Sequence, residues 1–209
     1  MKSKLVYGVG INDADYVTHK FETTEVNGKQ KRRLVWVCPY HQKWKHMLMR
    51  CYSAKYQEKK PTYKGCSVSE GWLTFSVFKS WMEKQDFEGK QLDKDILFEC
   101  NKVYSAETCV FVTRGINLFT TDRGNDRGEW LIGVYWEKGR GEFRSRCRNP
   151  STKKQEHLGY FTCEQQAHEA WLKRKLELAH LLAEEQTDER VAKALIERYT
   201  NYTNLGETK

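Results

Sequence analysis

The sequence has no apolar run that approaches the roughly 20 residues a helix needs to cross a bilayer. Its first residues, MKSKLVYGVG, lack the apolar core of a secretion signal. Internal repeats and low-complexity tracts are also missing. From these absences we expect a cytoplasmic protein with no membrane partner.

The seven cysteines are odd in number and scattered along the chain, whereas a secreted disulfide framework would be paired and denser. We expect most of them to be reduced and packed as small apolar side chains. The segment CPYH, from Cys38 to His41, looks like half of a metal site, with His46 and Cys51 further on. Zinc sites have two close ligand pairs, and the second pair is badly spaced here. The pattern disfavours zinc at Cys38 and His41 without deciding the point.

The charge is basic, with 36 Lys and Arg against 28 Asp and Glu. Basic charge favours polyanions by releasing condensed counterions, although an ordinary solvated surface has the same composition. Seven Trp and eleven Tyr supply enough bulk for real cores, which disfavours a wholly disordered chain. The length allows one or two compact domains.

The N-terminal half contains a hairpin signal and two helical patterns. An Asn27-Gly28 turn lies between the β-prone runs Phe21–Val26 and Leu34–Val37, which predicts a hairpin. Residues 40–52 and 72–82 carry apolar side chains at helical spacing. The expected buried stripes are Trp44, Met47, Leu48 and Cys51 in the first helix, and Trp72, Phe75, Phe78, Trp81 and Met82 in the second.

The C-terminal third predicts three strands followed by a long helix. The run GVYW is β-prone, and alternation from Phe143 to Cys147 places Arg144 and Arg146 on the face opposite Phe143, Ser145 and Cys147. The segment HLGYF supplies the third strand. A capping box of Thr162 and Gln165 is expected to start the helix, and a shorter helix follows over residues 188–199. The expected packing stripe is Ala167, Ala170, Trp171, Leu178 and Leu181.

About fifty residues of this segment resemble the APETALA-type DNA-binding domain of plant ethylene-response factors, which also occurs in phage endonucleases. The matching residues are Gly133, Val134, Trp136, Phe143, Leu158, Gly159, Phe161, Thr162, Ala167 and Ala170. The resemblance implies a sheet that enters the major groove of double-stranded DNA, where arginine forks read guanine and clamp phosphates. The DNA-binding residues implied are Arg140, Arg144, Arg146 and Arg148, with Tyr135 and Trp136 on the groove side.

Residues 44–119 resemble the phage HNH homing endonucleases, through WKHMLMRCY, PTYKGCSVSEGW, LDKDIL and NKVYSAETCVFVTRGINL. The resemblance implies one divalent metal, Mg²⁺ or another divalent cation, held by Asp93 and Asn117. Lys94 stands where the family has its general-base histidine, and a lysine is protonated at neutral pH. Thr108 stands where the family has an Asn that ties the loop by hydrogen bonds.

Several interpretations stay open at this point. The segment is an active nuclease whose base is a metal-bound hydroxide, His41 or His46; or a scaffold that has lost hydrolysis; or Asp93 and Asp95 are simply turn residues. The corresponding functions are a metal-dependent DNA endonuclease, active or weakened, and a non-catalytic regulator or anti-defence factor. A basic surface that binds an acidic host protein is a third.

The expected fold class is α+β. An HNH-like unit of the ββα-metal type is expected over residues 1–120, with a linker at 121–129. A three-stranded antiparallel sheet packed on one long helix is expected within 130–200. If the gene belongs to a phage, the location is the host cytoplasm.

Overall fold

The computed structural model describes residues 5–27, 29–121 and 129–205 and is a mixed α+β protein, as expected. The chain divides into two compact units, Met1–Phe111 and Val112–Lys209. The expected linker falls mostly on residues 122–128, which lie outside the described residues.

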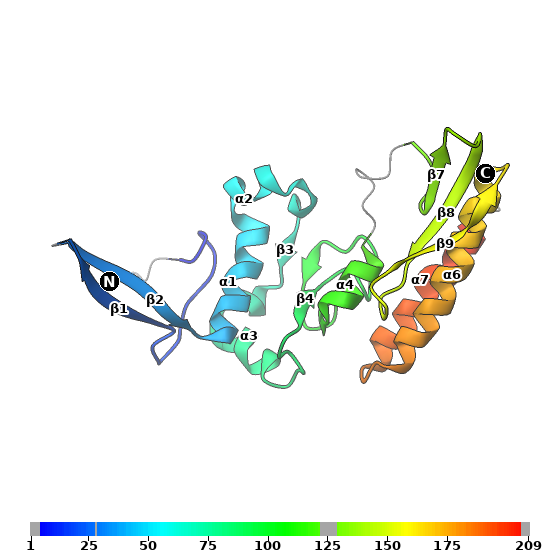
Figure 1. The fold of residues 1–209 in the computed structure, drawn as a ribbon. Coiled ribbons are helices and arrows are strands. Elements are labelled where there is room, and N and C mark those ends of the chain that lie inside the picture. Colours follow the sequence, from blue (N-terminus) through cyan, green and yellow to red (C-terminus); the bar gives the residue numbers. More distant parts are fainter. Residues whose placement is uncertain (1–4, 28, 122–128, 206–209) are drawn as a thin grey trace. The chain divides into compact units, whose positions relative to one another are not determined.

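The first unit begins with an antiparallel ribbon (Figure 1), which confirms the predicted hairpin. Strands β1 (His19–Val26) and β2 (Lys29–Val37) pair from His19 opposite Val37 to Val26 opposite Lys29. Asn27 has a φ of 54°, the left-handed geometry that tight hairpin turns need. Every residue of β2 is exposed except the last, which is half-buried.

The remaining elements of the first unit are short. The helices are α1 (Pro39–Tyr52), α2 (Ala54–Lys59) and α3 (Phe75–Met82), with 3₁₀ turns η1 (Pro61–Tyr63) and η2 (Glu70–Leu73). The strands are β3 (Ser67–Val68), β4 (Gln91–Asp93), β5 (Val103–Tyr104) and β6 (Val110–Val112). β3 pairs in parallel with β5, and β4 neighbours β6.

The core of the first unit is aromatic. The expected stripe of α1 is buried, and the indole of Trp44 donates to the Trp72 carbonyl at 2.8 Å. The ring of Trp72 lies 4.5 Å from Trp81 and 5.1 Å from Phe78. The second predicted helix is interrupted: residues 70–73 form a 3₁₀ turn, and Thr74 is extended before α3.

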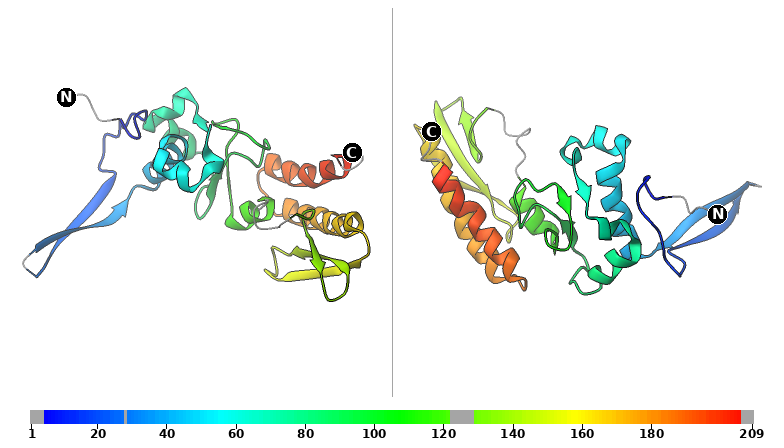
Figure 2. Two further views of the ribbon diagram at one scale, coloured as in Figure 1. Left: turned by 90° about the horizontal axis from the view of Figure 1, so that it is seen from above. Right: turned by 180° about the vertical axis from the view of Figure 1, so that it is seen from behind.

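The second unit contains the predicted sheet and helix. Its elements are α4 (Arg114–Thr120), β7 (Val134–Glu137), β8 (Glu142–Arg148), β9 (Gln155–Phe161), α6 (Glu164–Glu184) and α7 (Glu189–Leu205). The antiparallel sheet has the order β7-β8-β9. Figure 2 shows α6 against one face of this sheet, with α7 on the side of α6 away from it. Among the described residues of the second unit, no helix lies on the other face of the sheet.

Three details of the second unit differ from expectation. The N-cap of α6 is Cys163, one residue after Thr162, and no side chain caps it, so the predicted capping box does not form. The amide of Gln165 donates instead to Glu169. Leu181 is 53 % exposed, and the buried stripe is Ala167, Trp171, Leu172, Leu178, Ala179, Leu182 and Ala183. The last helix continues to residue 205 instead of ending near 199.

Within the described residues, no helix is both long enough and apolar enough to cross a membrane.

Candidate nucleic-acid interface

The three-stranded sheet has two different faces. Ser145 and Cys147 are fully buried on the face toward α6, and the intervening Arg144 and Arg146 therefore point to the other face, the outer face. A register shift between Ser145 and Arg146 bends the ladder without moving Arg146 onto the buried face, since it pairs with His157.

The outer face combines guanidinium groups with aromatic rings. Arg144 pairs across the sheet with Tyr135 on β7 and Tyr160 on β9. The guanidinium of Arg146 lies 4.0 Å from the Tyr135 ring centroid, and that of Arg140 lies 4.2 Å from the Tyr160 centroid. Stacking on rings holds the cations on the sheet.

Two of the four arginines are ion-paired. Arg144 bonds Glu137 at 3.0 Å, and Arg140 bonds Glu142 at 3.2 Å. Each arginine thus pairs with one of two glutamates that are opposite each other across β7 and β8. Arg146 and Arg148 have no carboxylate partner among the described residues, so their charge is uncompensated. Arg148 is exposed.

Trp136 lies away from the arginines. It pairs with Phe143, on the face opposite Arg144, and the two rings are 4.7 Å apart. Trp130 adds a third ring, 5.2 Å from Phe143. Trp136 is 39 % exposed at the end of the sheet, whereas Tyr135 lies on the outer face.

The sheet packs closely on α6. Gly133 precedes β7 with a φ of 83°, and an added Cβ would lie 2.1 Å from the ring of Trp171. Trp171 is 5 % exposed and stacks on His168. Near the β8–β9 turn, Arg174 of α6 forms a bidentate pair with Glu156, at 2.7 and 3.2 Å.

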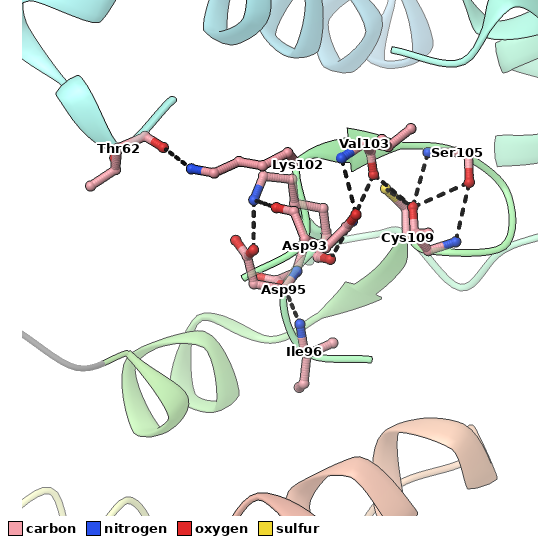
Figure 3. Close-up of polar contacts among 11 residues, drawn as sticks. Thr62, Asp93, Asp95, Ile96, Lys102, Val103, Ser105 and Cys109 are labelled. Atoms are coloured by element: carbon pink, nitrogen blue, oxygen red, sulfur yellow. Dashed lines mark hydrogen bonds and ion pairs between the residues drawn. The ribbon is translucent and has the colours of Figure 1, made fainter. Parts of the chain in front are cut away.

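In the first unit, Asp93 closes a turn at the end of β4 (Figure 3). One oxygen of its carboxylate accepts from the backbone N–H groups of Asp95 and Ile96, both at 2.8 Å. Burial raises the pKa of this carboxyl, while the two backbone hydrogen bonds act in the opposite direction. One carboxylate oxygen of Asp93 therefore stabilises the turn, and the other oxygen accepts neither of these two hydrogen bonds.

Lys94 lies inside this turn. Its side chain is 5 % exposed, and Nζ donates to Asp95 Oδ1 at 2.6 Å and to the carbonyl of Asn101. The ring of Tyr104 lies 5.9 Å away. The ammonium is held by two acceptors and a ring, so it does not point freely toward a substrate.

Two residues outside the predicted site organise the loop. Asn101 donates from its side chain to the carbonyls of Lys94 and Val103, and accepts from the Val103 N–H. Thr108 donates to the same Val103 carbonyl at 2.7 Å and accepts from the Ser105 N–H. Thr108 therefore ties the loop by hydrogen bonds, the role that the HNH resemblance gives to Asn. The sequence signal for the role of Asn101 was the tendency of an Asn side chain to bond the backbone two residues further on.

Asn117 lies on α4 and belongs to the second unit, whereas Asp93 belongs to the first. The carbonyl of Phe119, near the end of α4, accepts from Lys175 at 2.6 Å and from the Tyr199 hydroxyl at 2.9 Å. The Lys175 Nζ also lies 3.5 Å from the Phe119 ring. These contacts attach α4 to α6 and α7. Burial lowers the pKa of Lys175 to about 8.

The two candidate histidine bases differ in access. His41 is 4 % exposed beside Phe75 and His19, neither ring nitrogen has a partner among the described residues, and burial lowers its pKa to about 4. His46 is exposed, and its pKa is lowered by partial desolvation and then by Arg50 and the neighbouring lysines. Both imidazoles are therefore neutral at pH 7, and only that of His46 reaches solvent.

No group of three or more His, Cys, Asp or Glu side chains within the described residues is arranged to hold a metal ion. Cys38 is buried, and its sulfur lies 3.2 Å from the Tyr16 hydroxyl.

Comparison of the chain with protein-family models, curated proteins and solved structures finds no match.

Proposed function

We propose that this protein binds double-stranded DNA through the outer face of the β7-β8-β9 sheet. The observation that carries the proposal is the grouping of Arg140, Arg144, Arg146 and Arg148 on the face that no described helix of the second unit covers, while the other face packs on α6. The width of such a sheet suits the major groove.

The arginines divide into two roles. Arg146 and Arg148 lack carboxylate partners in the described chain and are available to phosphates. On binding, Arg144 and Arg140 would replace their glutamate partners with a phosphate or a guanine edge. Glu137 and Glu142 therefore disfavour DNA that does not make these contacts.

The test compares two variants that remove the same charge from the second unit. Arg144→Ala with Arg146→Ala removes two cations from the outer face, whereas Lys173→Ala with Lys193→Ala removes two exposed cations from α6 and α7. Loss of an arginine fork costs about 1–3 kcal/mol of binding. Gel retardation of a labelled duplex should show weaker binding for the first variant alone. Equal affinities for the two variants would contradict the proposal.

Metal-dependent cleavage of DNA is the second candidate function. The order of β4, β6 and α4, with Asp93 ending the first strand and Asn117 on the helix, supports it as the strand-strand-helix arrangement of HNH nucleases. The engaged ammonium of Lys94 opposes it, because a protonated lysine bonded to Asp95 cannot remove a proton from water. We therefore expect weak or absent cleavage, and a DNA-binding regulator or anti-defence factor is the alternative use of this scaffold.

Nicking of supercoiled plasmid with Mg²⁺, with and without EDTA, decides between these two functions. If cleavage occurs, Asp93→Asn should abolish it while duplex retardation is unchanged. His46→Gln tests whether His46 is the base. The substitution should abolish nicking if the imidazole is the base, and should leave it unchanged if a metal-bound hydroxide is. Retention of full nicking by Asp93→Asn would remove Asp93 from the active site.

A further inference from the structure

We propose that one face of the β1-β2 ribbon is a second contact for the phosphate backbone of duplex DNA. This surface lies in the first unit and is separate from the sheet of the second unit. The inference rests on the proposed function in that its partner is the same duplex, but its residues can be tested independently.

The pairing register assigns each ribbon residue to a face. Directly opposite residues share a face, and neighbours along a strand alternate. Glu22 faces Arg33, Thr24 faces Lys31, and beyond the bulge Lys20 faces Trp36. Together with Lys29 these residues form the basic face of the ribbon.

Two ring contacts agree with this assignment. Lys20 Nζ lies 5.5 Å from the Trp36 ring on the basic face. On the other face, the guanidinium of Arg32 lies 3.9 Å from the ring of Phe21, which pairs with Leu34.

The charge is concentrated on the basic face. It has four cations, Lys20, Lys29, Lys31 and Arg33, and one carboxylate, Glu22. None of the four cations is ion-paired with a carboxylate in the described part of the chain, and all four are exposed. The other face has Arg32 balanced by Glu25, beside apolar Phe21 and Leu34. A polyanion therefore distinguishes the two faces, and only the basic face attracts it.

The spacing of the cations suits a nucleic-acid backbone. Lys29, Lys31 and Arg33 alternate along β2, which separates them by about 6.8 Å per step. Phosphates follow one another every 3.4 Å or so along the axis of each DNA strand, so each step spans about two phosphates. A two-stranded ribbon also has a width that the major groove admits. The exposed Trp36 ring beside Lys20 adds an apolar contact at the base of the ribbon.

The experiment removes three cations from the basic face of the full-length chain and compares a matched control. The ribbon variant is Lys29→Gln, Lys31→Gln and Arg33→Gln. The control is Lys55→Gln, Lys59→Gln and Lys60→Gln, which removes the same charge from exposed positions on and just after α2. Because all six side chains are exposed, both proteins should keep the circular dichroism spectrum and melting temperature of the parent.

Binding of a labelled duplex is measured by fluorescence anisotropy between about 50 and 200 mM salt. The ribbon variant should bind at least about tenfold more weakly at the lower salt, and its slope of log K against log salt should be shallower by up to about 2.7, at about 0.9 for each phosphate that the variant no longer neutralises. The control should stay within about threefold of the parent. A charge-preserving variant, Lys29→Arg with Lys31→Arg, should bind like the parent.

The outcomes separate this inference from the proposed function. If the ribbon variant binds like the control while Arg144→Ala with Arg146→Ala binds weakly, the ribbon inference is wrong and the sheet stands. The reverse pattern supports the ribbon and removes the sheet. A parent that does not bind duplex DNA at all overturns both. Loss of binding only in Phe21→Ala with Leu34→Ala, together with a change from dimer to monomer, would show self-association through the apolar face and overturn the phosphate contact.

Discussion

Replacing Gly133 by alanine should destabilise the second unit strongly, because two independent features of the structure require glycine there. The residue has a φ of 83°, in the left-handed region that side chains with a Cβ avoid. The added Cβ would also lie 2.1 Å from two ring atoms of Trp171. A backbone shift is restricted because the Gly133 carbonyl accepts from the Arg146 N–H at 3.0 Å.

The expected cost follows from these two features. The left-handed backbone costs about 1–2 kcal/mol for a residue with a Cβ. Displacing a packed ring costs about 1–3 kcal/mol more. The sum is about 2–5 kcal/mol, and in a domain of roughly this size each kcal/mol lowers the melting temperature by about 4–8 °C. The transition of the second unit should therefore fall by at least about 8 °C.

Calorimetry of the full-length chain measures this, with Gly139→Ala as the control. Gly139 lies in the β7–β8 turn outside the left-handed region, and an added Cβ there meets nothing within 4 Å. Its substitution should change stability by no more than about 0.5 kcal/mol. If the two variants melt at the same temperature, the packing of Trp171 over Gly133 is wrong.

A double substitution separates the steric cost from the backbone cost. In a Trp171→Ala background, Gly133→Ala should lose the steric part, so its cost should shrink by about 1–3 kcal/mol. An unchanged cost in that background would show that the ring is not what the new methyl group meets.

Three other predictions follow from buried groups. Trp171→Ala should cost about 3–5 kcal/mol of unfolding free energy, since the ring is 5 % exposed; a variant that melts like the parent yet loses DNA binding would give the helix the reading role. Because burial lowers the pKa of Lys175 to about 8 from an ordinary value of 10.5, the unfolded chain binds an extra proton between these values, and stability should rise with pH by up to about 3 kcal/mol across that window. Urea titrations should show this rise in the parent and not in Lys175→Met, and equal slopes in the two would contradict it. Lys94→His should gain Mg²⁺-dependent plasmid nicking if the nuclease interpretation is correct, because it restores the general-base histidine, and no gain would count against that interpretation.

Periodicity predicted the C-terminal module well. Alternation along Phe143 to Cys147 assigned the buried and basic faces correctly, because strand side chains alternate whatever they pack against. The same rule places Trp136 and Tyr135 on different faces of the sheet, whereas the resemblance had implied that both lie on the groove side. The register shift between Ser145 and Arg146 has no local sequence signal, since it depends on the partner strand.

Local capping signals were less reliable. Thr162 and Gln165 have the spacing of a capping box, yet the helix starts at Glu164. The carboxylate of Glu164 accepts from the Leu131 N–H at 2.6 Å, a long-range contact that no local pattern contains. Tertiary contacts also decide the buried stripe, which includes Leu172 and Leu182 in place of Leu181.

The ribbon shows the limit of propensity. Residues 29–33 are KQKRR, a composition that does not favour a strand, so the predicted second strand began only at Leu34. Pairing with β1 from the Asn27 turn extends it. The sequence singled out Asp93 and Lys94 as candidate site residues. It did not predict that Lys94 donates to Asp95 and to the Asn101 carbonyl, since these contacts depend on the conformation of the loop.

The salt dependence of duplex binding tests the central claim most directly. If Arg144 and Arg146 each contact a phosphate, the slope of log K against log salt should be shallower by about 1.8 in Arg144→Ala with Arg146→Ala than in the parent, at about 0.9 per phosphate. The Lys173→Ala with Lys193→Ala control should keep the parent slope. Identical slopes and affinities for all three proteins would show that the outer face of the sheet does not bind DNA.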